Sequence, residues 1–513
     1  MTQLLNVHVR INAGETGQPT PVRLRFADEK GTYYPPLGRV ADFPYGRNED
    51  VGGHLHNLRT QFAYVSGSCE VPLPTAVPLT VEVSKGPCYV PVRQTLTLGA
   101  GQLSLRLVIS PSTSELAAQF THADSRCHFL TPHSAALEAQ AEGLQFVNLL
   151  AVVQDFPSNA GHMYRTIPNI TAYSGSQPAA TFENGGVFVN TYNVHSALGR
   201  LALLNTHRTV YPLTAGGMDE FDDWSLLDWC AQCHRKKGLV VWCEAARPDA
   251  PLPSGESLLA AILGKIDALE FAADEKSLPF LPMWYRLLNA GLRLPLVGGS
   301  GKDNNRVALG AIRTLTPRVT AYGEWIEAVR GGQTTVTNGP LLSFTVNGQA
   351  WGADSNPHER LQMVAKAESI EPFDRLEIVA NGETIASTAA KTGELWTAQL
   401  EVEHQLPQGG WLAARCLGAT KPSLYPQLPT LAHTSPRWVQ ATGAPQRRDS
   451  AALRVLRKDV ERIRAWAETQ ARYSNDKPRE QMLARCDSAL EKLAESTEAG
   501  WLNPTPGPSP KRG

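Results

Sequence analysis

The chain has 513 residues and a formal net charge of -1. One hydrophobic core rarely supports such a length, and a prior of one domain per roughly 150 residues predicts three or four domains. A balanced charge argues against the basic field that nucleic-acid binding uses, so we expect a small-molecule ligand. The first residues lack the features of a signal peptide and no apolar run reaches the ~18 residues of a membrane span, so we expect a cytoplasmic protein with no membrane partner.

Residues 1–112 are expected to form an N-terminal β-sandwich. Short runs in which apolar and polar residues alternate recur there, for example at 22–26, 79–83 and 103–107. A period of two that is interrupted by Gly and Pro is typical of antiparallel strands with one buried face. Two packed sheets of such strands fit this segment.

Residues 113–333 are expected to form a distorted α/β barrel. Helical segments alternate there with apolar runs. The helical segments are 133–142, 222–237, 254–263 and 281–290, and the apolar runs are 146–153, 239–242, 266–271, 294–297 and 308–315. This alternation predicts parallel strands with crossover helices and an active site at the carboxyl ends of the strands.

The rest of the chain is expected to contain a second β-domain, a helical hairpin and a tail. Alternation with a period of two returns over 334–440. From Asp449, a suitable helix N-cap, apolar residues recur at spacings of three and four over 449–498, which predicts two amphipathic helices. The Pro-rich segment 499–513 has little to bury and is expected to be disordered.

A row of polar residues marks the strand that enters the predicted barrel. His122, Asp124, Arg126 and His128 alternate with small residues, so a strand would place all four on one face. Imidazole and carboxylate groups ligate Zn, Mn or Fe, and a bound cation would explain the cost of burying them. The alternative is a set of hydrogen-bonded polar residues at the mouth of the strand.

The same residues begin a resemblance to a known family. The segment 124–128 resembles the first-strand Asp-x-His-x-His motif of the polymerase-and-histidinol-phosphatase (PHP) superfamily of metal-dependent hydrolases. Later segments are similar to its CehA/McbA branch, named for carbaryl hydrolase; they are 238–242, 264–270, 295–300 and 337–340. The resemblance implies a PHP-like barrel that follows an N-terminal β-domain, and a metal-dependent hydrolase activity.

The chain departs from the family pattern at several ligand positions. Arg126 and Arg200 stand where the family has histidines, and the resemblance leaves four ligands, which are Asp124, His128, Glu244 and Asp303. A guanidinium group stays protonated and cannot ligate a metal. At 4 Å and an effective dielectric constant of 20 it repels each unit of positive charge by roughly 4 kcal/mol. We therefore expect one divalent cation (Zn, Mn or Fe) rather than a cluster.

Two functions from different classes fit these residues. In the first, one cation activates water to hydrolyse an ester, amide or phosphoester. Arg126 or Arg200 would then bind an anionic group of the substrate or the developing oxyanion, and His195 would protonate the leaving group.

In the second, the arginines replace the metal and pair with the carboxylates, so that a metal-free barrel acts as a binding or scaffold protein. The arrangement of the side chains distinguishes the two. Carboxylates around an open centre would favour the cation, whereas direct arginine–carboxylate pairs would favour the metal-free protein.

Overall fold

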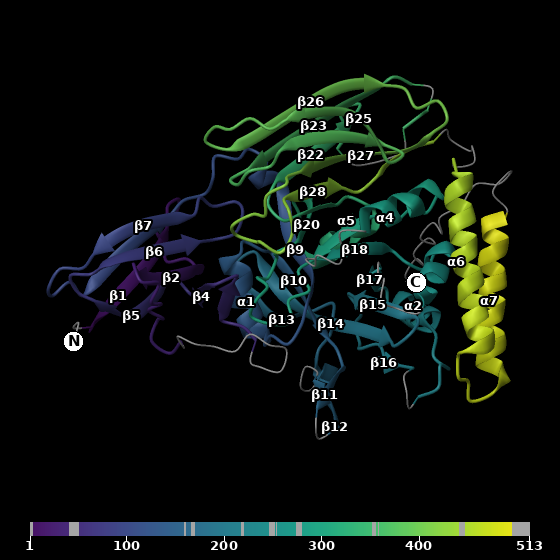
Figure 1. The fold of residues 1–513 in the computed structure, drawn as a ribbon, viewed down its shortest axis with the longest axis horizontal. Coiled ribbons are helices and arrows are strands. Elements are labelled where there is room, and N and C mark those ends of the chain that lie inside the picture. Colours follow the sequence, from purple (N-terminus) through teal and green to yellow (C-terminus); the bar gives the residue numbers. More distant parts are fainter. Residues whose placement is uncertain are drawn as a thin grey trace, which may run out of the picture.

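The chain folds into a mixed α/β structure that is mostly sheet (Figure 1). The computed structural model describes residues 4–39, 51–158, 161–165, 170–216, 220–245, 252, 254–272, 280–350, 355–357, 359–440 and 447–494. In these residues there are seven α-helices, none of which is long and apolar enough to cross a membrane. The predicted tail, 499–513, and the last residues of the predicted hairpin lie outside the described residues.

The N-terminal region contains two sheets that share one core. Their strand orders are β5-β1-β8 and β3-β4-β2-β6-β7. The strands are β1 (Leu4–Ala13), β2 (Val22–Asp28), β3 (His54–Asn57), β4 (Thr60–Val65), β5 (Ser68–Pro74), β6 (Pro78–Ser84), β7 (Val92–Thr97) and β8 (Ser104–Ile109). Alternate residues such as Val7, Val9 and Ile11 enter the core, as the period of two predicts. The described strand pairs are antiparallel except β1 with β8, which is parallel.

The central region is built around a long sheet with the order β19-β18-β17-β15-β14-β10-β9-β20-β21. Its main strands are β9 (Phe120–Cys127), β10 (Phe146–Ala151), β14 (Gly185–His195), β15 (Gly199–Leu204), β17 (Leu239–Cys243), β18 (Ala268–Ala272), β19 (Leu296–Gly299), β20 (Arg313–Pro317) and β21 (Thr335–Thr337). Shorter strands are β11 (Gln154–Ser158), β12 (Gly161–Arg165), β13 (Pro178–Phe182) and β16 (Thr214–Ala215). The pairs β9–β10, β10–β14, β17–β18 and β18–β19 are parallel as predicted, whereas β15 and β20 run antiparallel to their neighbours.

This sheet is curled, so that its first strand lies against its later strands. Gly298 in β19 donates its N–H to Thr314 Oγ1 in β20 (2.8 Å), and Thr314 Oγ1 donates to the Gly298 carbonyl (3.2 Å). A side chain thus joins β19 to β20. Residues of β9, β10, β14, β15, β17 and β18 form one cluster inside the curl together with Trp325, Ile326 and Val329 of helix α5 (Tyr322–Arg330).

Four helices pack outside the curled sheet near the positions that the sequence predicts, and a fifth, which the sequence does not predict, contributes to the cluster inside the curl. They are α1 (Pro132–Ala141), α2 (Leu226–Arg235), α3 (Gly255–Ile262), α4 (Phe280–Asn289) and α5 (Tyr322–Arg330), with short 3-10 turns η1 (Ala117–Gln119) and η2 (Ile170–Ala172). Caps explain two starts: Thr131 accepts the N–H of Ser134 before α1, and Ser225 accepts the N–H of Leu227 before α2. Helices α2, α3 and α4 bury outer-face residues of β15, β17 and β18 in one large cluster.

The C-terminal β region continues the central sheet. Strand β28 (Leu431–Thr434) pairs with β21, and the sheet extends through β27 (Gly410–Leu417), β24 (Arg375–Ala380) and β25 (Glu383–Ala389), with β29 (Arg437–Val439) beside β27. A second sheet of β22 (Leu341–Val346), β23 (Leu361–Ser369) and β26 (Trp396–His404) packs on it around a common core. The predicted strands are present, but hydrogen bonds connect them to the central region.

The last two helices form the predicted hairpin and pack on the central region (Figure 1). Helix α6 (Ser450–Thr469) and helix α7 (Asp476–Ala494) bury Leu456, Val460 and Met482 in the same cluster as α3 and α4. Arg485 in α7 also donates to Asp228 in α2 (2.9 Å). The domain boundaries expected from the sequence stay predictions, because both the C-terminal sheet and the hairpin share contacts with the centre.

Candidate functional site

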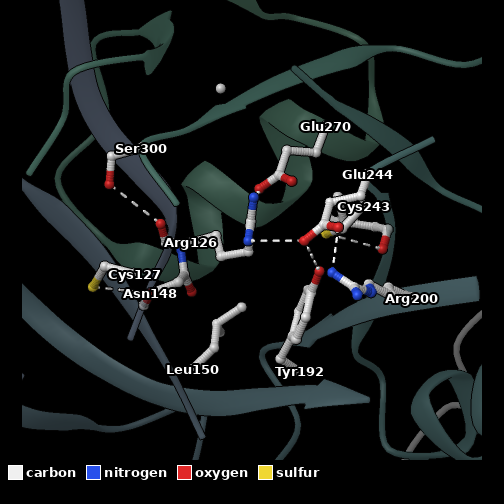
Figure 2. Close-up of polar contacts among 12 residues, drawn as sticks. Arg126, Cys127, Asn148, Leu150, Tyr192, Arg200, Cys243, Glu244, Glu270 and Ser300 are labelled. Atoms are coloured by element: carbon white, nitrogen blue, oxygen red, sulfur yellow. Dashed lines mark hydrogen bonds and ion pairs between the residues drawn. The ribbon is translucent and has the colours of Figure 1, made fainter. Parts of the chain in front are cut away.

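The site is organised around the guanidinium group of Arg126, which lies between two carboxylates (Figure 2). Its Nε donates to Glu270 Oε1 (2.7 Å), and its Nη1 lies 3.6 Å from Glu244 Oε1. The ring of Tyr192 is 5.3 Å from Arg126 Cζ, a distance at which an aromatic ring stabilises a cation. Arg126 is therefore held by two carboxylates and one aromatic ring.

A second arginine and a phenol hydroxyl complete the contacts of Glu244. Arg200 Nη1 donates to Glu244 Oε2, and Tyr192 donates its hydroxyl to Glu244 Oε1 (2.8 Å). Burial alone would raise the pKa of Glu244, but Arg126 and Arg200 outweigh it and lower the pKa to about 2. Glu244 is thus an ionised carboxylate with three different donor side chains.

Strand directions explain how these distant residues meet. Glu244 follows the last residue of β17, and Glu270 lies in the parallel strand β18. Because β15 is antiparallel to β17, its second residue, Arg200, pairs with Cys243 at the same edge. Arg126 is the penultimate residue of β9. The cluster forms at the carboxyl ends of parallel strands, the edge where the alternation of strands and helices predicts a site.

Two glycines allow the chain to approach this cluster closely. A Cβ atom at position 299 would lie 2.4 Å from Glu270 Oε1, and one at position 301 would lie 3.0 Å from Arg126 Nη2. Gly301 also has a φ of 62°, which favours glycine. Their missing side chains make room for Arg126 and Glu270.

The predicted row on β9 does not lie on a single face. The pairing of β9 with β10 shifts register between Val147 and Leu149. Asp124 pairs with Val147, and Cys127, three residues later, pairs with Leu149. Both partners belong to one cluster on the outer face of the sheet. One extra residue in a strand reverses the side-chain alternation beyond it. Asp124 therefore faces away from Arg126, and the expectation of four polar groups on one face is wrong.

Asp124 binds backbone N–H groups. Its Oδ1 accepts from Arg126 (3.0 Å) and Ser300 (3.0 Å), and its Oδ2 accepts from Gly310 (2.8 Å). Burial raises the pKa of Asp124, and these hydrogen bonds oppose that rise. These hydrogen bonds connect the end of β9 to the segment that follows β19.

The two remaining predicted ligands differ in their surroundings. His128 is buried beside the cluster, with Nδ1 3.1 Å from the Leu150 carbonyl and its ring centroid 5.1 Å from that of Tyr192. A carbonyl only accepts, so Nδ1 carries the proton. Asp303 is in the loop after β19, where its Oδ1 accepts from Asn304 (2.7 Å).

The predicted acid His195 lies on the opposite face of β14 from Tyr192. Tyr192 and Val194 belong to the inner cluster, and His195 is one position further along the strand. Its Nδ1 accepts the N–H groups of Ala197 (3.3 Å) and Leu198 (3.2 Å), and burial lowers its pKa to about 4. A buried neutral imidazole on the outer face is poorly placed to protonate a leaving group bound at Arg126.

The four predicted ligands do not fit a common cation. Asp124 is bound by backbone donors and faces away, while Glu244 is bound by two arginines and a tyrosine. Two guanidinium groups stand beside the carboxylates that a cation would need, and each repels positive charge. The geometry of the described residues therefore disagrees with a divalent metal at this position.

Two residues of the cluster were not predicted as site residues. Glu270 is buried and is the closest partner of Arg126, and Tyr192 contacts both Arg126 and Glu244. A charged residue near the carboxyl end of an apolar parallel strand is a signal that identifies Glu270. Tyr192 has no comparable signal, because an aromatic residue in a strand usually belongs to the core.

Comparisons of the chain with protein-family models, with curated proteins and with solved structures give no match.

Proposed function

We propose that the chain is a metal-free small-molecule binding protein built on a distorted PHP-like barrel. The observation that carries this proposal is the guanidinium group of Arg126 between Glu270 and Glu244. Arg200 supplies a second positive charge to Glu244. The cationic charge that a metal would bring is thus supplied by the chain itself.

Several features support the barrel and the place of the binding site within it. Strand β19 lies against β20, and helices cover the outer face of the curled sheet. Arg200 and Glu244 are each 30% exposed, whereas Glu270 is buried. A small molecule would reach the cluster through this exposed pair. We also propose that the ligand is a small molecule and that the protein is cytoplasmic.

Metal-dependent hydrolysis is the competing function, and it has a clear structural requirement. Both arginines would have to leave Glu244 before that carboxylate could ligate a cation. Because Glu244 and Arg200 are each 30% exposed, breaking this pair costs less than the ~3–5 kcal/mol of a fully buried pair. The free energy of metal binding would have to offset this cost before any net binding occurs.

Elemental analysis of the purified protein tests the proposal. We expect no stoichiometric Zn, Mn or Fe, and no change in melting temperature with a chelator. Glu244→Gln is the matched variant, since it keeps the size of the side chain and removes the charge. One equivalent of metal that is present in the wild type and lost in Glu244→Gln would overturn the proposal, whereas metal retained by the variant is bound elsewhere.

A further inference from the structure

Glu244 occupies a position that is built for a carboxylate. Its two oxygens receive hydrogen bonds from Tyr192 (2.8 Å) and Arg200, and Arg126 Nη1 lies 3.6 Å from Oε1. Planar guanidinium groups match carboxylate oxygens in geometry and charge. Any carboxylate placed between these three side chains would make the same contacts.

Arg200 retains a donor that Glu244 does not use. Arg200 Nε is buried and has no hydrogen-bond partner in the described part of the chain. Next to Arg126 Nη2, position 301 is a glycine, and a Cβ there would lie 3.0 Å from this nitrogen. A buried N–H without a partner is costly, so a group that binds it gains free energy. The site has more donors than its resident carboxylate satisfies.

The backbone of Glu244 indicates that its contacts impose its conformation. Its φ is 49°, in the left-handed region that residues with a side chain seldom adopt. Such strain persists only where the surroundings hold it, and it concentrates at functional sites. With 30% of its side chain exposed, Glu244 has a route into solvent.

We propose that Glu244 is an internal stand-in for the carboxylate of a small ligand, which displaces it from between Arg126, Arg200 and Tyr192. This inference rests on the proposed metal-free site. The ligand class follows from the charges: Glu270 neutralises Arg126, so displacement of Glu244 leaves one unpaired positive charge at Arg200. One charge and three donor groups that already hold a planar carboxylate match a monocarboxylate better than a phosphate dianion.

Removal of the stand-in should open the position to an external carboxylate. In Glu244→Ala, sodium acetate should raise the melting temperature by about 2–4 °C above sodium chloride of equal ionic strength, because only acetate binds the folded state specifically. The effect should vanish when Arg200→Leu is added, and in Glu327→Ala, which removes an exposed glutamate far from the site in sequence, it should be no larger than in the wild type. Equal effects of acetate and chloride would overturn the inference, and a larger effect of inorganic phosphate would overturn the ligand class.

A second measurement does not depend on the stability of an alanine variant. Phenylglyoxal modifies exposed arginines, and mass spectrometry reports the modification of Arg200, whose side chain is 30% exposed. Acetate should protect Arg200 in the wild type and should do so at about a tenfold lower concentration in Glu244→Gln, since a weaker internal competitor raises the apparent affinity. Protection that is identical in both proteins, or absent from both, would overturn the displacement of Glu244.

The two proposals fail separately. A metal that depends on Glu244 would remove the basis of both. Absence of acetate binding in a protein without stoichiometric metal would remove only the inference about the ligand.

Discussion

Two networks in this protein use arginine and glutamate, and they differ in how far their side chains are exposed to solvent. At the junction of three regions, Glu142 receives the hydroxyls of Tyr64 (2.8 Å) and Tyr425 (2.7 Å), and Arg23 Nε is 2.9 Å from its Oε1. Arg313 adds a hydrogen bond to the Tyr425 hydroxyl (2.6 Å). Arg23 and Glu142 are at most 1% exposed.

The network at Glu244 has the same residue types but a different balance. Glu244 and Arg200 are 30% exposed, and Glu244 has a left-handed backbone. The junction joins the N-terminal, central and C-terminal regions through side chains that are almost wholly buried. The comparison indicates that exposure and local backbone strain, rather than ion pairs as such, distinguish a candidate binding site from a structural network.

The largest effect is expected at the junction. Glu142→Ala leaves Arg23 buried without its carboxylate, and breaking a buried pair in this way costs about 3–5 kcal/mol. Urea denaturation followed by tryptophan fluorescence should show the midpoint falling accordingly. The matched control is Glu327→Ala, whose salt bridge to Arg330 is 70% exposed on the glutamate side, and it should change stability by less than ~0.5 kcal/mol. Equal effects of the two substitutions would refute the structural role of the junction.

Glu270→Ala should have the next largest effect. It removes the closest partner of Arg126, but Glu244 remains 3.6 Å away and continues to compensate part of the charge. We expect a loss of about 1.5–3 kcal/mol, the range for a hydrogen bond to a charged group. The same urea titration measures it. A loss as large as that of Glu142→Ala would mean that the two networks are equally structural, and the contrast between them would fail.

A smaller difference in stability is expected between the glycine and alanine variants at position 244. Both substitutions remove the carboxylate, but only glycine adopts a φ of 49° without steric cost. Glu244→Gly should therefore be about 1 kcal/mol more stable than Glu244→Ala. A difference in the opposite direction would show that the backbone at this position relaxes when the side chain is removed, and that Glu244 stores no strain.

The sequence predicts the elements of the fold better than their connections. Helices α1 to α4 begin within four residues of the predicted starts, because capping residues and apolar spacing are local signals. The pairing of β21 with β28 is not a local signal, since Thr335 and Thr434 are far apart in the chain. The continuity of the central and C-terminal sheets therefore could not be predicted from alternation alone.

The residues of the candidate site were also predicted only in part, because some of their contacts are not local in sequence. Arg126, Arg200 and Glu244 do meet, because the order of strands and helices places strand ends at one edge. The position of Asp124 could not be foreseen, since it follows from a register shift between β9 and β10, and its hydrogen bonds come from Ser300 and Gly310, which are distant in the sequence. Which residues ligate, bind or catalyse stays a prediction that the experiments above test.

The smallest effect concerns pH. The pKa of Glu244 falls from 4.5 to about 2 in the folded protein, owing mainly to Arg126 and Arg200 against the opposing effect of burial. A lowered carboxyl pKa stabilises the folded state above the unfolded pKa, and this contribution is lost as the pH falls through the folded pKa. The wild type should therefore be more stable than Glu244→Gln at pH 7, and the gap should close between about pH 4.5 and 2. Because the pair is partly exposed and screened, the gap at pH 7 should stay below ~1 kcal/mol.

Melting temperatures of the wild type and Glu244→Gln at pH 7, 5 and 3 measure this gap. The control Glu327→Gln, at an exposed position, should show almost no gap at any of these pH values. A gap for Glu244→Gln that widens towards pH 3 would mean that the arginines do not hold Glu244 in its ionised form. The site would then not be one that binds a carboxylate.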